Sequence, residues 1–336
     1  MGVAVLEQAA EREQGIRPLD ILRDLDGVGQ LIDLVFADDI ARDGANLQRD
    51  LALLTAVSPF LWVLRRVSAE VRDAFDGFVW IEEGHVVGNV TLTRDDPGRN
   101  IWTITNVAVY PAYRRRGIAR ALMEACLCAV AERGGGLVVL EVKADNAAAY
   151  NLYLKLGFRY VDGQVTARLA GHMLRHPLEL AQVPAVHRVT FGEGWKLWQL
   201  ALATRSRLAQ QITPLRLEDY SPRIMRWLVG RIRDVLSNER TIWLAIEEED
   251  RFLAAAQIRH HAARNSSINM LIHPEGRNRV EASIIDAVLA VCAPLSKSIT
   301  LQVASDQQKA LDILQHHGFS VVRNLHRLMI EVTPAT

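Results

Sequence analysis

A basic turn with a single glycine lies between a strand-like run and a helix-like run, and it constrains the fold more than any other segment. The run Ile104–Val109 alternates apolar residues, the turn is Pro111–Arg120, and Ala121–Ala131 has helical spacing. The first N–H groups of a helix are unpaired and carry about half a positive charge, so such a turn can bind an anion. Gly117 would let the anion approach bare backbone. The sequence therefore predicts a phosphate site here, with a solvated arginine run as the alternative.

A second segment, about twenty residues downstream, favours the phosphate site over the solvated run. Leu137–Val142 is a continuous apolar run typical of a buried strand, and Asn146 is a helix-capping residue type that precedes the helical run Ala147–Lys155. Gly157 then follows the last turn of that run, where a left-handed glycine commonly ends a helix. The order predicted by these segments is strand, turn, helix, strand, helix, strand.

Together the two segments resemble the GNAT superfamily of N-acetyltransferases. Its signature is Arg/Gln-x-x-Gly-x-Gly/Ala, followed by Asn-x-x-Ala, a Tyr and Gly-Phe. The matching residues here are Arg114, Gly117, Ala119, Asn146, Ala149, Tyr153, Gly157 and Phe158. The nearest resemblance is to the ribosomal-protein alanine acetyltransferase branch, where a Tyr follows a Glu by twelve positions, as Tyr153 follows Glu141. The resemblance covers residues 15 to 178 and is sharpest over 104 to 160.

The resemblance implies acetyl-CoA as cosubstrate and assigns its contacts. Backbone amides of the turn would bind the diphosphate, and a strand edge would pair with the pantetheine amides. The residues so assigned are Val107, Ala108, Val109, Arg114, Arg115, Arg116, Gly117, Ile118, Ala119, Arg120, Asn146 and Ala149. In GNAT folds the two central strands splay apart at this point, and the Val107 N–H would polarise the thioester carbonyl there.

Glu141 and Tyr153 are the candidate catalytic residues. Glu141 would accept a proton from the incoming ammonium directly or through water, and its alternative role is a structural hydrogen bond at a strand end. Tyr153 would give a proton to the departing sulfur, as its family position implies, and its alternative role is a core tyrosine. The expected reaction is direct attack of a primary amine, either a peptide α-amine or a small-molecule amine, on acetyl-CoA in a ternary complex. The rival from another class is a non-catalytic acyl-CoA-binding sensor or scaffold.

The second half of the chain repeats the first in altered form. Ile212–Leu215 echoes Ile16–Leu19, and Arg277–Ala282 stands where the first half has its basic turn. Several functional positions differ: Gly117, Ile118, Glu141, Asn146 and Tyr153 correspond to Val280, Glu281, Gln302, Gln307 and Leu314. A valine and a carboxylate would obstruct a diphosphate. We therefore expect a GNAT-like second domain that has lost its thioester site.

These observations predict an α/β (α+β) chain of two tandem GNAT-like domains, each with a mixed, mostly antiparallel central sheet flanked by helices. The expected segments are a leader at 1–14, a catalytic domain at 15–178 closed by a strand at His172–His176, a linker with a connecting helix at 179–210, and a degenerate domain at 211–336. The apolar run Leu51–Leu64 is expected to be a core-facing helix pair, with a lid over the acceptor site as the alternative.

The composition limits which classes of binding partner are expected for this chain. Lys plus Arg and Asp plus Glu both total 39, so no net charge attracts nucleic acid or a membrane surface, and neither is an expected partner. Three unevenly spaced cysteines are expected to be buried small hydrophobes, and no signal peptide or long apolar span is visible, which favours the cytoplasm. No metal is expected, because the adjacent pairs His260-His261 and His316-His317 rarely ligate one ion. The acceptor and the oligomeric state stay open, with a homodimer as one option.

Overall fold

The chain divides by its contacts into two compact units. The computed structural model describes residues 14–37, 76–171, 185–220, 240–261, 265–293 and 296–335. Unit 1 comprises Met1–Val142, Asn146–Tyr160 and Arg327–Thr336, and unit 2 comprises Lys143–Asp145 and Val161–His326. The first thirteen residues of the expected leader, the run Leu51–Leu64 and the expected strand His172–His176 lie outside the described residues.

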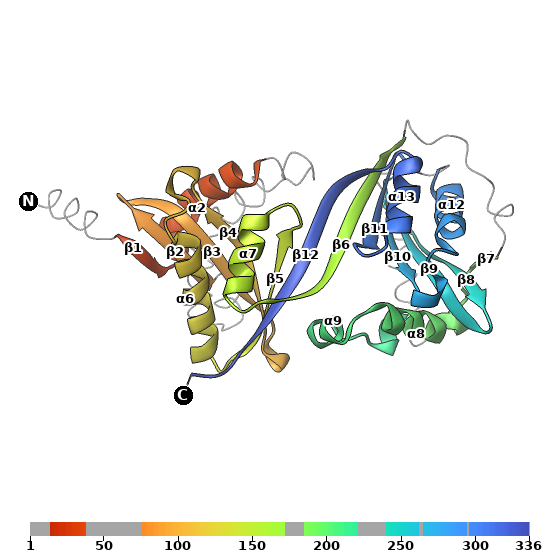
Figure 1. Ribbon diagram of the computed structural model, residues 1–336, viewed down its shortest axis with the longest axis horizontal. Coiled ribbons are helices and arrows are strands. Elements are labelled where there is room, and N and C mark those ends of the chain that lie inside the picture. The colour runs from red at the N-terminus through yellow and green to blue at the C-terminus, as the bar shows by residue number, and fades with distance from the viewer. Residues whose placement is uncertain are drawn as a thin grey trace, which may run out of the picture. The chain divides into compact units, whose positions relative to one another are not determined.

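Unit 1 is a mixed sheet packed against helices (Figure 1). Its elements are β1 (Gly15–Pro18), α2 (Ile21–Val35), β2 (Asp76–Glu82), β3 (His85–Asp96), β4 (Ile101–Val109), α6 (Ile118–Glu132), β5 (Gly136–Lys143) and α7 (Ala147–Lys155). The strand order is β1-β2-β3-β4-β5, with the end of β12 (Ser320–Val332) next to β5. Strands β1 to β4 pair antiparallel, whereas β4 and β5 run parallel. This is the mixed, mostly antiparallel sheet that the sequence predicts.

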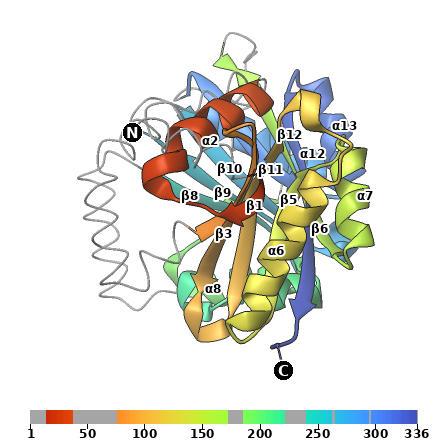
Figure 2. The same ribbon diagram turned by 90° about the vertical axis from the view of Figure 1, so that its left-hand side faces the viewer.

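Helix α6 lies along the strands of unit 1 and closes one side of its core (Figure 2). Leu122 and Cys126 recur at helical spacing and are fully buried together with Trp102 and Ile104 of β4. Gly88 of β3 lets the helix approach closely, because a Cβ there would lie 2.8 Å from the Ile118 side chain. The start of α6 is thereby fixed against the sheet.

The last residues of the chain complete unit 1, which differs from the expected domain ranges. Leu328 is fully buried in the core of unit 1, and the Ala335 N–H donates to the Ala131 carbonyl at 2.9 Å. Conversely, β6 (Arg159–Ala170) leaves unit 1 after Tyr160 and pairs antiparallel with β11 (Ser298–Ala304) in unit 2. Strand pairing between residues so far apart in sequence leaves no local pattern from which a boundary could be drawn.

We expect Leu328→Ala to lower the free energy of unfolding by about 2–5 kcal/mol, because it leaves a cavity in the core of unit 1. Val321→Ala, in the same strand but 47% exposed, is the matched control and should cost little. Urea unfolding monitored by circular dichroism measures both variants. Equal stability of the two variants would show that the C-terminal strand contributes nothing to unit 1.

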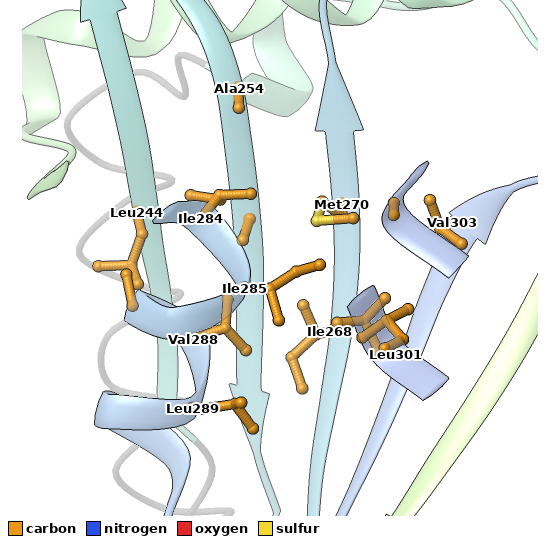
Figure 3. Close-up of a cluster of buried hydrophobic side chains, with 14 of the residues drawn as sticks. Leu244, Ala254, Ile268, Met270, Ile284, Ile285, Val288, Leu289, Leu301 and Val303 are labelled. Atoms are coloured by element: carbon orange, nitrogen blue, oxygen red, sulfur yellow. The ribbon is translucent and has the colours of Figure 1, made fainter. Parts of the chain in front are cut away.

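From its second meander strand onward, unit 2 repeats the order of elements in unit 1, but it begins with β6 and has three described helices between β7 (Val186–Arg188) and β8 (Arg240–Glu248). Its elements are β6, β7, α8 (Gly194–Thr204), α9 (Arg207–Ile212), α10 (Leu217–Tyr220), β8, β9 (Arg251–His260), β10 (Asn265–Ile272), α12 (Glu281–Cys292), β11, α13 (Gln308–His316) and the first part of β12. The strand order is β6-β11-β10-β9-β8-β7. Figure 3 shows Ile284, Ile285 and Val288 of α12 facing Ile268 and Leu301 of the sheet, and all five are buried.

The segment 179–210, expected to be a linker with a connecting helix, contains helix α8 and contributes elements to unit 2. Strand β7 pairs with β8 and occupies the place that β1 has in unit 1. Leu197 and Leu200 of α8 pack against Ala245 and Phe252 of the sheet. The sequence echo at Ile212–Leu215 does not correspond to a strand like β1, because Ile212 ends α9 and residues 213–215 form no strand. A three-residue strand is too short to show periodicity, so the repeat was aligned with the wrong segment.

The cysteines are unpaired and differ in exposure. Cys126 and Cys292 are buried as expected, whereas the expectation is wrong for Cys128, which is exposed. Burial raises the pKa of the Cys292 thiol to about 12, so this side chain remains a neutral apolar group. Among the residues described, no helix combines the length and apolarity that crossing a membrane requires.

Candidate active site

The central strands of unit 1 separate beside Glu141. β4 and β5 pair in parallel from Ile101↔Leu137 to Ile104↔Leu140, and residues 105–109 of β4 then continue beside β3 without pairing to β5. Glu141 directly follows the last pair and is exposed, whereas its neighbour Leu140 is buried in the core under α6. Because side chains alternate along a strand, Glu141 points away from that core. The gap where β4 and β5 separate, here called the splay, therefore has the edge of β4 that no longer pairs with β5 on one side and the Glu141 carboxylate at its start.

A β-bulge distorts β4 at the start of this free edge. Thr105 pairs with Thr91 and Ala108 pairs with Asn89, so Asn106 and Val107 together face a single residue of β3. Asn106 has a φ of 53°, in the left-handed region. Bulges of this kind redirect the backbone of the longer strand. The bulge includes Val107, whose N–H the sequence singles out.

The basic turn forms an open helix N-terminus. Gly117 is the N-cap of α6 with a φ of 82°, a left-handed conformation that glycine adopts readily. Among the residues that the structure describes, no side chain caps this end, and the first turn of α6 holds no acidic residue. A Cβ at Gly117 would meet nothing within 4 Å, so space is open beside the backbone. The unpaired N–H groups and the helix dipole make this turn suitable for an anion such as a diphosphate.

The arginines of the turn have different surroundings. The Arg114 Nε donates to the Val109 carbonyl at 3.2 Å, and the Arg116 guanidinium lies 4.9 Å from the centre of the Tyr113 ring. Arg120 is paired with Glu124 one turn along α6, with both side chains about half exposed. Arg115 is exposed and has no side-chain partner among the residues that the structure describes. Of the four, Arg115 is therefore the most available to an incoming anion.

Tyr153 lies on α7 and is 5% exposed, within the core of unit 1. Burial raises the pKa of its hydroxyl to about 12, which keeps it protonated at neutral pH. Its ring lies 6.0 Å from that of Phe158, and the hydroxyl has no hydrogen-bond partner in the described part of the chain. A buried tyrosine hydroxyl is usually paired, so this one is available to a ligand.

Asn146 caps α7, as the sequence predicts. Its side-chain oxygen accepts a hydrogen bond from the Ala149 N–H at 3.1 Å. Ala149 itself is half-buried against the core of unit 1. This capping hydrogen bond is enough to explain an asparagine at position 146. The expected contact of Asn146 with pantetheine stays a prediction.

The corresponding turn of unit 2 is filled by its own carboxylate. Glu281 is 3% exposed, and its Oε1 accepts a hydrogen bond from the Asn278 N–H at 2.6 Å. Asn278 keeps the left-handed φ that Arg115 has in unit 1, at 64° against 66°, but Val280 has a φ of −112° where Gly117 has 82°. The backbone amide that could bind an anion is therefore already paired within the chain.

Unit 2 also contains a polar cluster that the sequence reasoning missed. Ligand-type atoms of His187, Glu193 and Glu247 lie within 4.8 Å of one another. Thr190 donates from its N–H and hydroxyl to Glu193, both at 2.7 Å, and these hydrogen bonds lower the pKa of that carboxyl. Lys196 Nζ lies 2.7 Å from Glu247, so an ammonium already balances part of the negative charge. Neither histidine pair noted in the sequence belongs to this cluster.

Comparison with known proteins gives a family match over the part of the chain that holds these residues. The model of the acetyltransferase (GNAT) family matches residues 52–158. The [ribosomal protein bS18]-alanine N-acetyltransferase of Escherichia coli K12 is 48% identical over 56 residues, which are 17% of this chain and 38% of that protein. The mycothiol acetyltransferase of Amycolatopsis mediterranei is 32% identical over 145 residues, 36% of this chain and 48% of that protein. The chain thus spans less than half the length of these curated relatives.

The fold comparison extends over nearly the whole chain. The GCN5-related N-acetyltransferase from Sphaerobacter thermophilus superposes with a TM-score of 0.60 and 14% identity, covering 96% of this chain and 97% of that one. At this identity the likeness concerns the fold alone. The range 52–158, which is similar to the GNAT acetyltransferase family, includes both the open turn and the splay.

Proposed function

We propose that unit 1 is an N-acetyltransferase that moves an acetyl group from acetyl-CoA to a primary amine by direct attack in a ternary complex. The splay between β4 and β5 carries the proposal, because it places an unpaired strand edge next to Glu141. The family match and the open turn at Gly117 support it. Acetyl-CoA is the cosubstrate that this family implies.

The turn and the strand edge would hold the thioester. The N–H groups after Gly117 would bind the diphosphate, with Arg115 adding charge from outside. The free edge of β4 would pair with the pantetheine amides as an added strand. This arrangement would direct the thioester carbonyl toward the bulge, where the Val107 N–H would stabilise negative charge on its oxygen.

Two side chains would move the protons. Glu141 would accept a proton from the incoming ammonium, directly or through water, which leaves a neutral amine to attack the carbonyl carbon. As the carbon–nitrogen bond forms, the carbon–sulfur bond breaks and Tyr153 would protonate the departing thiolate. The new amide nitrogen would lose its extra proton through water to the Tyr153 phenolate, which restores the hydroxyl. Burial keeps this hydroxyl protonated at neutral pH, so the proton is present when the thiolate leaves. Holding both reactants in place would contribute much of the rate.

The proposed acceptor is a peptide α-amine. The local identity to the bS18-alanine N-acetyltransferase supports this class, although it covers only 17% of this chain. A small-molecule amine is the second candidate, supported by the match to the mycothiol acetyltransferase. We place the reaction in the cytoplasm, which the balanced charge and the free cysteines support.

We expect Glu141→Gln to lower kcat about 100-fold, because the amide cannot accept the ammonium proton. Thiol release from acetyl-CoA is measured with a panel of alanine- and serine-starting peptides and of small amines. Glu124→Gln, which neutralises an exposed carboxylate on α6, is the matched control and should keep wild-type turnover. Tight binding of acetyl-CoA with no amine-dependent thiol release would instead support the non-catalytic binding module.

A further inference from the structure

Asn89 is a buried polar residue that faces the bulge in β4. Its side chain is 0% exposed, and its Nδ2 donates to the Asn106 carbonyl at 3.1 Å. Its Oδ1 is buried and has no partner among the residues described. A leucine has a similar shape and would fill this place without an unpaired acceptor. Core packing alone therefore does not account for a carboxamide here, whereas its contact with the bulge does.

The bulge has a backbone conformation that needs support. Asn106 has a φ of 53°, which side-chain-bearing residues adopt only at some energetic cost, asparagine less than most. Two side-chain hydrogen bonds restrain it: Asn89 holds its carbonyl, and its own Nδ2 donates to Thr91 Oγ1 at 3.3 Å. Both partners lie on β3, so the neighbouring strand fixes the bulge from outside.

The equivalent strands of unit 2 have neither the bulge nor the asparagine. β9 and β10 pair in unbroken register from His260↔Ser266 to Ala254↔Ile272. The β9 positions in this stretch include three consecutive buried alanines at 254–256. β10 and β11 nevertheless stop pairing after Asn269↔Gln302, so this unit also ends its parallel ladder without a bulge. The bulge thus accompanies the open anion turn of unit 1 and is absent from the unit whose turn is filled.

We propose that Asn89 is a positioning residue, which fixes the Asn106 carbonyl and so sets the direction of the Val107 N–H beside the splay. Asn106 and Val107 have no register partner of their own on β3, so without the Asn89 hydrogen bond the ladder can slip into the regular pairing seen in unit 2. The inference rests on the proposed function, since Val107 is the group proposed to polarise the thioester carbonyl. Asn89 itself would touch neither substrate.

The test combines turnover, binding and structure in the full chain. Asn89→Leu should lower kcat for amine-dependent thiol release at least about tenfold, since a misdirected donor loses much of an oxyanion contact. The Kd for coenzyme A should stay within about threefold, because the turn at Gly117 is untouched. Thr93→Val removes a hydroxyl from the same face of β3 and is the matched control, expected to keep wild-type kcat.

A rescue experiment separates positioning from general packing. Asn106→Gly adopts a positive φ without strain, so the double variant Asn89→Leu/Asn106→Gly should recover part of the lost kcat. A crystal structure of Asn89→Leu should show residue 106 at negative φ and the β3–β4 register shifted. An unchanged bulge, or wild-type kcat in Asn89→Leu, would overturn the role of Asn89. Absence of amine-dependent release by the wild-type chain would instead overturn the proposed function itself.

Discussion

Replacing two residues of the basic turn in unit 1 by their counterparts in unit 2, Val280 and Glu281, is expected to weaken coenzyme A binding. The loss should be at least about 100-fold, or about 2.7 kcal/mol. In Gly117→Val/Ile118→Glu, valine cannot hold a φ of 82° without strain, and the turn should relax toward the φ of −112° found at Val280. The new carboxylate can then accept the N–H of residue 115, as Glu281 accepts that of Asn278. A like charge in the turn also repels the diphosphate.

Isothermal titration calorimetry with coenzyme A measures this loss. Gly117→Val/Ile118→Gln is the matched control, because it keeps the shape of the new side chain and omits its charge, and it should bind more tightly than the Glu variant. A Kd for the Glu variant within threefold of wild type would contradict the assignment of the anion site. The same titration of the wild-type chain should saturate at one coenzyme A, because Glu281 already fills the turn of unit 2.

Tyr153→Phe is expected to lower kcat at least about 100-fold with little change in the Kd for acetyl-CoA. The ring keeps its place in the core, while the proton for the departing thiolate is lost. Steady-state thiol release with a saturating amine measures the change, and Tyr150→Phe on the same helix is the matched control. Wild-type kcat in Tyr153→Phe would leave Tyr153 with a packing role alone.

The raised pKa of Tyr153 has two further consequences. The hydroxyl stays protonated up to a pH of about 12, so it should cause no loss of kcat between pH 7 and 10, and a decline centred near pH 10 would contradict its assignment. The unfolded chain releases this proton more readily, since its pKa there is near 10. Stability contributed by the neutral hydroxyl is therefore complete below pH 10 and is lost as the pH rises toward 12. Thermal melts of wild type and Tyr153→Phe across this range test the difference.

The elements around the anion site could be predicted because each carries a local signal. The spacing of apolar residues predicted α6, and the capping residue type and the glycine stop predicted α7 between Asn146 and Gly157. The GNAT resemblance that these segments carry implied a mixed, mostly antiparallel sheet, and the structure shows that β4 and β5 are a parallel pair within it. Helix periodicity and caps depend on residues within a few positions of one another, which a single sequence displays.

Other features depend on contacts that have no local pattern. The three-residue β7 becomes a strand only by pairing with β8, so the sequence of 179–210 indicated a linker with a connecting helix and no strand. The sequence analysis did not select Asn89, although it is a polar residue within the strand-like segment Val86–Leu92. The role proposed for Asn89 depends on its hydrogen bond to the carbonyl of Asn106, a residue with left-handed φ that lies seventeen positions away.

The sequence by itself determined the chemistry available to this protein: a glycine at the start of a helix, a glutamate and a tyrosine twelve residues apart, and an altered copy with Val280 and Glu281. These are properties of residue type and short spacing. Only the tertiary structure decided that the parallel ladder ends beside Glu141, that Glu281 occupies its own turn, and that Leu328 belongs to the core of unit 1. Strand register and burial arise from pairing between distant segments, and no residue or neighbouring set of residues specifies them alone.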